Sequence, residues 1–232
     1  MGGSMDDYAL ALSVDVTGNV CVGGAFKASA NIGNTTLTSA GNWDSFITKL
    51  DASGNFQWAK SFGGTANDLV YSIALDQSGN IYATGSFGFT VDFDPGPGVF
   101  NMSVSGNGGG TEIFVLKLNA SGNFVWAKQL GGNGAEEGYS IALDIPTGDI
   151  YTTGYFSGTA DFDPGPGVYN LSANNFDFYI SKLSGTGNFL WAKSLGGPEA
   201  DEGHSVCVGP NGNVYVAGFL RNTSDLYPGP GT

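Results

Sequence analysis

The stretch GNFQWAKSFGG, from Gly54 to Gly64, decides the fold because the chain repeats it as GNFVWAKQLGG (Gly122–Gly132) and GNFLWAKSLGG (Gly187–Gly197). Long copies at nearly constant spacing are typical of repeat architectures, in which one supersecondary unit is used several times. The chain is therefore expected to be an array of similar units that stack on one another.

Three further motifs recur in the same order in these units. The first is SIALDQSGNIYATGSF, the second is SFITKLD, and the third is DFDPGPG. Their copies begin at Ala11, Ser72, Ser140 and Ser205 for the first, at Ser45, Ile113 and Tyr179 for the second, and at Asp92, Asp161 and, degraded to DLYPGPG, Asp225 for the third.

Each unit holds four short runs rich in aromatic and β-branched residues, bounded by Gly, Asn and Asp; in the second unit they cover 71–76, 81–87, 113–119 and 124–130. Such runs predict strands joined by hairpins, and the Gly-Asn turns between them supply the positive φ that tight hairpins need. Four antiparallel strands in a unit of this length are typical of a β-propeller blade. A β-helix coil is shorter, and an immunoglobulin-like sandwich needs about seven strands. The predicted fold class is an all-β propeller of four-stranded antiparallel blades.

Together, the patterns K-L-x-x-x-G-N-x-x-W-A-K-x-x-G-G, S-I-A-L-D-x-x-G-N-I-Y-x-T-G-x-F and DFDPGPG resemble the bacterial β-propeller repeats called SBBP repeats. The resemblance covers nearly all of 7–231, and the first unit departs from it because no DFDPGPG follows Phe26. It implies β-meander blades, commonly seven, in a large secreted or surface protein. It implies no enzymatic activity.

The register of the motifs predicts blades at 7–67, 68–135 and 136–200, a half blade at 201–232, and a foreign N-terminal tail at 1–6 left over from cloning. About three and a half blades form an open arc, which exposes blade faces and a strand edge. We expect either missing sequence or a second copy of the chain to complete the propeller. Two copies of three and a half blades suggest a homodimeric ring of seven.

The composition excludes several classes of partner. The 232 residues include 39 Gly and carry a net charge of -13, with only 8 Lys and Arg. Nucleic acids and anionic membranes need a cationic surface, and no apolar run is long enough to insert into a bilayer. Neither class is therefore expected. Cys21 and Cys207 are both interpreted as small, buried hydrophobic residues, although the sequence also allows them to pair.

The repeated tryptophans Trp58, Trp126 and Trp191 are predicted to pack between neighbouring blades, because large aromatic side chains bury the most apolar surface. The alternative is that they stack against a bound ligand at the surface.

The DFDPGPG loops offer the most pointed candidate for a metal site. Each sets two carboxylates two residues apart before a Pro-Gly-Pro-Gly turn, at Asp92 and Asp94 and at Asp161 and Asp163. Ca²⁺ prefers six to eight oxygen ligands, which carboxylates and loop carbonyls supply. The spacing is not that of an EF-hand loop, and the alternative is that the aspartates only cap the turn. No other cofactor is expected.

A second acidic set follows each Gly-Gly pair and comprises Asp68, Glu136 and Asp201. If the strand that follows is the innermost one, these carboxylates form a ring at the mouth of the central channel and attract cations or polar ligands. The alternative is a solvated loop that keeps the protein soluble.

No catalytic residues are expected. The single histidine, His204, stands where Tyr71 and Tyr139 stand in other units, so it is interpreted as a packing or surface residue. No nucleophile elbow or Cys-His set surrounds it.

The sequence therefore predicts a non-enzymatic, extracellular or bacterial cell-surface propeller that acts as a scaffold for protein interaction or adhesion, its signal peptide lying outside this sequence. One alternative is a lectin-like propeller that binds carbohydrate in pockets between blades, and another is a calcium-stabilised spacer. The lectin hypothesis requires exposure of the repeated Tyr82, Tyr151 and Tyr215.

Overall fold

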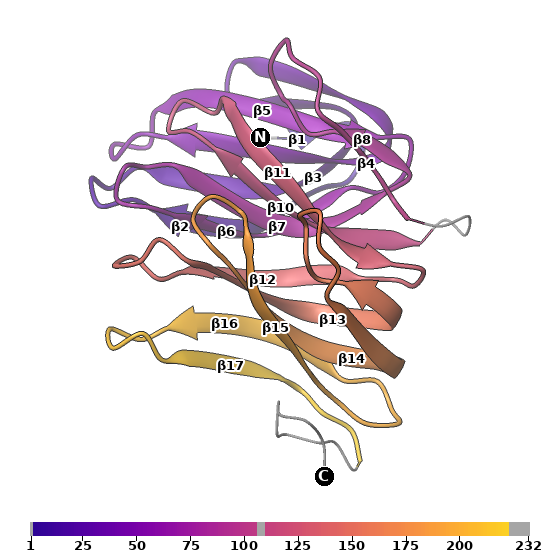
Figure 1. Ribbon diagram of the computed structural model, residues 1–232. Helices are drawn as coiled ribbons and strands as arrows, with labels where there is room; N and C mark the ends of the chain where they lie inside the picture. Colours follow the sequence, from indigo (N-terminus) through magenta and orange to yellow (C-terminus); the bar gives the residue numbers. More distant parts are fainter. Residues whose placement is uncertain (1, 106–109, 223–232) are drawn as a thin grey trace.

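The computed structural model describes residues 2–105 and 110–222, and all regular structure in these residues is antiparallel β-strand, with no helix. Four strands build each of three blades, and the sheets are stacked in chain order from blade 1 to the C-terminal pair (Figure 1). The prediction of an all-β fold made of antiparallel repeats is confirmed.

The strands of each blade follow one another in sequence from the first to the fourth. Blade 1 holds β2 (Asp7–Val14), β3 (Val20–Ile32), β4 (Thr35–Leu50) and β5 (Phe56–Gly64); blade 2 holds β6 (Leu69–Leu75), β7 (Ile81–Gly88), β10 (Thr111–Leu118) and β11 (Phe124–Gly132); blade 3 holds β12 (Glu137–Leu143), β13 (Ile150–Asp161), β14 (Asn170–Leu183) and β15 (Phe189–Leu195); the half blade holds β16 (Glu202–Val208) and β17 (Val214–Phe219).

The first strands of successive blades contact one another, β2 with β6, β6 with β12, and β12 with β16, so they lie nearest the common axis. The half blade thus consists, in its described part, of the two inner strands. Nothing in the described residues tests whether a second copy completes the propeller, so the seven-bladed homodimer stays a prediction. The DLYPGPG motif lies outside the described residues.

Short turns end the hairpins, and in four of them one Asp or Asn side chain accepts two backbone N–H groups. Asp51 Oδ1 accepts hydrogen bonds from the backbone N–H groups of Ser53 (2.9 Å) and Asn55 (2.8 Å), while Gly54 takes a φ of 81°. The same pattern forms at Asp15, Asp76 and Asn119. Repetition of D-x-x-G-N therefore fixes the hairpin register.

The core lies between blades rather than within one. Phe62 of blade 1 meets Phe114 of blade 2 edge to face, with ring centroids 5.6 Å apart, and both side chains are buried. The blades approach so closely at Gly23 that a Cβ there would lie 2.5 Å from the Cδ1 of Ile73. Burial of both faces explains why units with so little charge stack stably.

A hairpin at the outer rim joins each blade to the one before it. β8 (Thr90–Asp92) and β9 (Asn101–Ser103) continue the long second hairpin of blade 2, and β8 pairs with the end of β5, Gly63 with Asp92 and Gly64 with Val91. In blade 3 the end of β13 pairs with β11 in the same register.

The N-terminal residues also follow the repeat. β1 (Gly2–Gly3) pairs with β3 at Asn31 and Ala30, in the register that Gly63 and Gly64 use with β8. These two glycines take the place that the end of a fourth strand takes at the other junctions, and the interpretation of 1–6 as a foreign tail stays a prediction because pairing does not test the origin of the residues.

Candidate functional site

The acidic residues predicted for a channel mouth are buried at the blade junctions instead. Asp68, Glu136 and Asp201 are all 0% exposed. Asp68 Oδ2 accepts a hydrogen bond from Gly64 N–H (2.7 Å) and Oδ1 accepts one from Gly88 N–H (3.0 Å). Its own N–H donates to the carbonyl of Trp43 (2.7 Å). The expectation of a solvent-facing acidic ring is corrected: this carboxylate ties blade 1 to blade 2.

Asp201 repeats this arrangement between blade 3 and the half blade. Its carboxylate accepts hydrogen bonds from the N–H groups of Gly197 (2.8 Å) and Arg221 (2.7 Å), and its N–H donates to the Phe176 carbonyl (2.7 Å).

Glu136 fits its junction less well. Its Oε2 accepts a longer hydrogen bond from Gly132 N–H (3.2 Å), and its buried Oε1 has no partner among the described residues. Burial raises the pKa of Glu136 to about 8, the Gly132 hydrogen bond lowers it, nearby Glu112 raises it further, and the backbone of Gly134 lowers it. The extra methylene of Glu moves the carboxylate away from the position that Asp occupies elsewhere.

A second buried carboxylate at each junction was missed from the sequence. Asp44 is 3% exposed, Glu112 1% and Asp177 9%. Burial raises the pKa of Asp44 and of Asp177 to about 6, and Asp201 acts on Asp177 in the same direction. Each stands two residues before the aromatic residue of the third strand, so self-comparison of the repeats held a signal for them.

The aspartates of the rim hairpins organise turns. Asp92 Oδ1 accepts hydrogen bonds from the N–H groups of Asp94 (3.1 Å) and Phe100 (2.8 Å), and Asp94 Oδ1 accepts one from Gly96 N–H (2.8 Å). Asp161 and Asp163 make the corresponding bonds. In 2–105 and 110–222, no three His, Cys, Asp or Glu side chains lie close enough together to hold a metal ion. These hydrogen bonds are the ones expected if the aspartates only cap the turn, and calcium binding by these loops stays a prediction.

The acid that reaches the inner surface is the residue after Glu136. Glu137 accepts hydrogen bonds from the hydroxyls of Tyr71, Tyr155 and Tyr139. Burial raises the pKa of Glu137, and these hydrogen bonds oppose the shift. Burial, with the charge of Glu137, raises the pKa of Tyr71 to about 12. Glu136 precedes β12 and Glu137 is its first residue, so the two neighbouring acids have different surroundings.

His204 extends this aromatic and acidic surface onto β16. Its ring stacks on Tyr139 at 5.4 Å with an interplanar angle of 17°, and its Nε2 lies 3.3 Å from Glu202 Oε2. The histidine thus takes the place of a repeated aromatic residue.

The repeated tryptophans are half-buried and face the next blade. A Cβ at Gly122 of blade 2 would lie 3.1 Å from Trp58, and one at Gly187 of blade 3 would lie 3.4 Å from Trp126. Trp191 packs in a cluster that includes Val216 of the half blade. Two of the repeated tyrosines are buried, Tyr82 at 4% and Tyr151 at 3% exposure. Tyr215, at 56%, is exposed.

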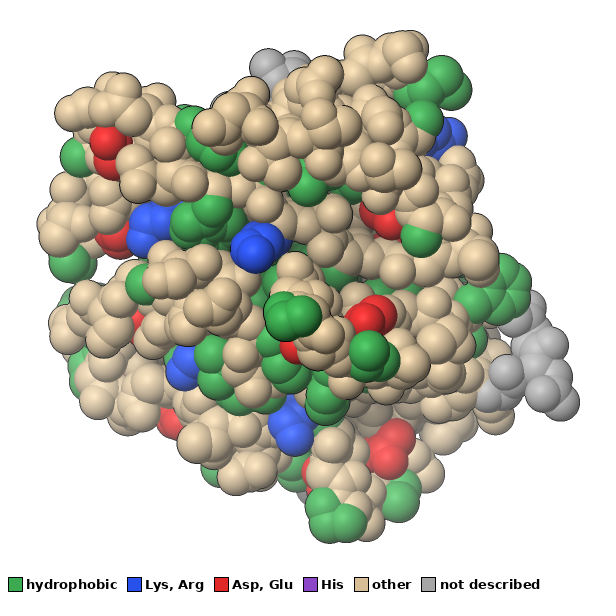
Figure 2. All heavy atoms as spheres, turned by 90° about the horizontal axis from the view of Figure 1, so that it is seen from above, with side chains coloured by type: hydrophobic (Ala, Val, Ile, Leu, Met, Phe, Trp, Pro, Cys, Tyr) green, Lys and Arg blue, Asp and Glu red, His purple; other side chains and the backbone are tan. Residues whose placement is uncertain are grey.

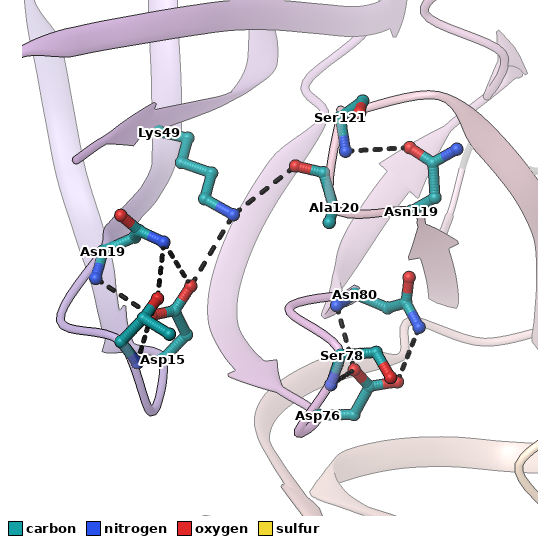
Figure 3. A network of polar contacts seen from close by, with 10 residues as sticks. Asp15, Asn19, Lys49, Asp76, Ser78, Asn80, Asn119, Ala120 and Ser121 are labelled. Carbon is teal, nitrogen blue, oxygen red and sulfur yellow. Dashed lines mark hydrogen bonds and ion pairs between the residues drawn. The ribbon is translucent and has the colours of Figure 1, made fainter.

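One pocket opens between blades 1 and 2 at the end of the blades that carries the D-x-x-G-N turns. It has a volume of about 300 Å³ and is lined by Asn19, Lys49, Asp51, Gln57, Trp58, Ala120 and Ser121. Lys49 spans the junction beside it, with Nζ 3.7 Å from Asp15 Oδ2 and 3.4 Å from the Ala120 carbonyl (Figure 3).

Basic side chains do not gather on the face that Figure 2 shows; each lies beside hydrophobic or acidic side chains. Both cysteines are free thiols, Cys21 buried and Cys207 exposed. Among the described residues there is no helix long and apolar enough to cross a membrane.

Comparison with known proteins agrees with this architecture. An uncharacterized WD repeat-containing protein of Acanthamoeba polyphaga mimivirus is 25% identical over 97% of this chain. The regulatory protein FlaEY of Caulobacter vibrioides is 24% identical over 84% of it. The chain spans only 19% and 21% of the length of these two relatives. The family model of the SBBP β-propeller repeat matches residues 57–86, from β5 through β7. The resemblance drawn from the repeated motifs is thus confirmed: this chain carries an SBBP β-propeller repeat at residues 57–86.

Proposed function

We propose that this chain is a non-enzymatic scaffold for protein interaction, part of an extracellular or cell-surface protein. The observation that carries the proposal is the equivalent exposure of two valines on the rim hairpins, Val99 at 72% and Val168 at 71%. Single exposed apolar side chains are common on protein surfaces, and what distinguishes these two is that they recur at the same place on successive blades.

The backbone is fixed at both places. The residue directly after each valine is held by an aspartate. The N–H of Phe100 donates to Asp92 Oδ1 and the N–H of Tyr169 donates to Asp161 Oδ1, both at 2.8 Å. Phe100 packs on Phe124 at 4.9 Å between ring centroids, and Tyr169 packs on Phe189 at 4.8 Å. Two rigid apolar tips at corresponding places on successive blades favour a partner that spans blades, because two linked contacts bind more tightly than one.

The experiment compares capture of native surface proteins by the immobilised chain with capture by a Val99→Asp/Val168→Asp double variant. A partner held by the wild type and lost from the double variant supports the proposal. The matched control is Val16→Asp, at another exposed position (78%) in the first hairpin turn of blade 1. If every captured protein binds all three chains equally, the rim tips are not the contact surface.

Self-association is a further part of the proposal. Leu12 is 65% exposed, whereas Ile73, Ile141 and Val206, at the same place in later units, are 7%, 5% and 5% exposed because a neighbouring blade covers them. Another blade, such as that of a second copy, would bury this face. Light scattering measures the mass in solution, and a monomer at all concentrations argues against self-association of this chain.

The calcium-stabilised spacer rests on the rim carboxylates alone. If calcium binds the folded chain there, removing it with a chelator lowers the melting temperature. The hypothesis of a lectin with a carbohydrate pocket between every pair of blades requires exposed tyrosines. It is weakened because Tyr82 and Tyr151 are buried.

A further inference from the structure

The pocket between blades 1 and 2 is lined by Lys49 and Trp58, and both lie beside a buried position at which blade 1 departs from the repeat. In blade 2, Tyr82, Lys117 and Trp126 lie side by side across three paired strands. The ring of Tyr82 lies 6.3 Å from that of Trp126, and Lys117 Nζ lies 4.6 Å above the tyrosine ring. The tyrosine ring thus contacts both the lysine and the tryptophan.

Blade 3 repeats this row, and blade 1 does not. Tyr151 lies 6.0 Å from Trp191 and has Lys182 above it at 5.1 Å. In blade 1 the corresponding residue is Cys21, which pairs with Lys49, and Lys49 pairs with Trp58. A thiol is much smaller than a phenol ring, so Trp58 and Lys49 lack the aromatic neighbour that their counterparts have.

A second departure makes the pocket polar. Gln57 stands where blades 2 and 3 have Val125 and Leu190, whose side chains are 45% and 46% exposed. Gln57 Nε2 donates to Asp51 Oδ2 at 3.3 Å and to the Asn55 carbonyl at 3.4 Å. No hydrogen bond within the described chain uses its Oε1, which is left to accept a ligand hydroxyl.

Lys49 adds a buried donor. It is 8% exposed, and its ammonium has three N–H groups. Two of them are directed at Asp15 and at the Ala120 carbonyl (Figure 3). The third is available to a ligand in the pocket, and Asp15 already balances the charge of Lys49. Asp51 adds a further carboxylate to the lining, so there is no excess positive charge to hold an anion, and the hydroxyls of a neutral ligand suit the donors and acceptors present.

We propose that the pocket lined by Lys49, Asp51, Gln57 and Trp58 binds one neutral hexopyranose ring, with the sugar against the exposed part of the Trp58 indole and its hydroxyls bonded to Gln57 and Lys49. A volume of about 300 Å³ is at the lower end of ligand pockets and suits a single ring. The site is a property of blade 1 alone, so it differs from a propeller lectin with equivalent pockets at every junction.

The test follows the indole N–H signals of the tryptophans by NMR while methyl β-glucopyranoside, methyl β-galactopyranoside or methyl α-mannopyranoside is added to the 232-residue chain. A Trp58→Phe variant identifies the Trp58 signal. We expect a saturable shift of that signal with at least one glycoside and a Kd on the order of 1 mM, as for a small ligand with few polar contacts.

Two variants convert the pocket to the pattern of the other blades. Cys21→Tyr supplies the missing ring, and Gln57→Val removes the polar group; each is expected to weaken binding by about tenfold or more. Leu190→Ala, at the position in blade 3 that corresponds to Gln57, is the control and leaves the Kd unchanged. If Cys21→Tyr does not fold, Gln57→Val decides.

Absence of a saturable shift with all three glycosides overturns the proposal. So does binding that Gln57→Val leaves unchanged, because the ligand would then lie elsewhere.

Discussion

The Oδ2 atom of Asp68 accepts a hydrogen bond of 2.7 Å from the backbone N–H of Gly64, the last residue of β5. Through Oδ1 the same carboxylate holds the N–H of Gly88, the last residue of β7. One buried side chain thus satisfies a donor from each of two blades. Since a buried donor left without an acceptor costs about 1–3 kcal/mol, the stability of the stack depends on this residue.

Replacing Asp68 with Ala is expected to lower the free energy of unfolding by about 2–4 kcal/mol, because two buried N–H groups lose their acceptor. Urea unfolding at pH 8, where the carboxyl with its pKa of about 6 is ionised, measures the loss. Asp6→Ala is the control, since Asp6 is exposed and surface changes of this kind alter stability by less than about 0.5 kcal/mol. Equal losses in the two variants contradict the role assigned to Asp68.

Shortening Glu136 to Asp is expected to stabilise the chain by about 0.5–1.5 kcal/mol, the net value of one further hydrogen bond. The aspartates at the other two junctions each accept two N–H groups, whereas Glu136 accepts one from Gly132 at 3.2 Å. The backbone of Gly134 acts on the pKa of Glu136 but makes no hydrogen bond of good geometry with Oε1. Urea unfolding of the single variant measures the gain.

The reverse exchange, Asp68→Glu, is the matched control and is expected to destabilise by a similar amount. A loss of stability in Glu136→Asp would show that the longer side chain is an adaptation of the second junction, contrary to our account.

The repeats predicted the four strands of a blade, their order and their turns, because glycines, asparagines and aromatic residues recur at fixed places. They did not predict which of two adjacent acids would be buried. Glu136 and Glu137 both follow a loop, and alternation along a strand sets no orientation until the first strand residue is known. That residue is Glu137.

Other features lay below what self-comparison detects. Gly2 and Gly3 belong to the repeat through only two pairings with β3, and a motif of two glycines has no weight in a glycine-rich chain. The pocket beside Trp58 required knowing that Cys21, Lys49 and Trp58 are neighbours across strands. Strand register supplied that relationship, which spacing along the chain does not give.

The junction carboxylates predict that stability falls as the pH rises. In the folded chain the pKa is about 6 for Asp44, Asp68 and Asp177, against 3.8 ordinarily, and about 8 for Glu136, against 4.5. Between these values the unfolded chain releases its protons while the folded chain keeps them, so the free energy of unfolding decreases with increasing pH. The stabilisation is complete below about pH 4 and is lost by about pH 8.

Urea unfolding at intervals from pH 5 to pH 9 measures this slope. Glu136→Gln has no proton to lose, so the part of the decrease that extends from pH 6 to pH 8 should flatten in this variant. A wild-type stability that rises over that range is incompatible with protonated carboxyls at the junctions.

The contact between Trp58 and the turn of blade 2 can be isolated by comparing two glycines. Gly54 and Gly122 occupy the same place in the turns of blades 1 and 2 and have φ values of 81° and 76°. Alanine in this left-handed region costs about 1–2 kcal/mol at either place. Only at Gly122 does the added Cβ also meet a neighbour, with three ring atoms of Trp58 at 3.1 Å, whereas nothing lies within 4 Å at Gly54.

Gly122→Ala should therefore destabilise more than Gly54→Ala in urea unfolding, by about 0.5–1.5 kcal/mol, because overpacking adds to the backbone strain. In a Trp58→Ala background the extra loss at Gly122 should vanish, since the double-mutant cycle removes the contact itself. If the two glycines respond equally in the wild-type background, Trp58 does not pack against blade 2 as tightly as the structure has it.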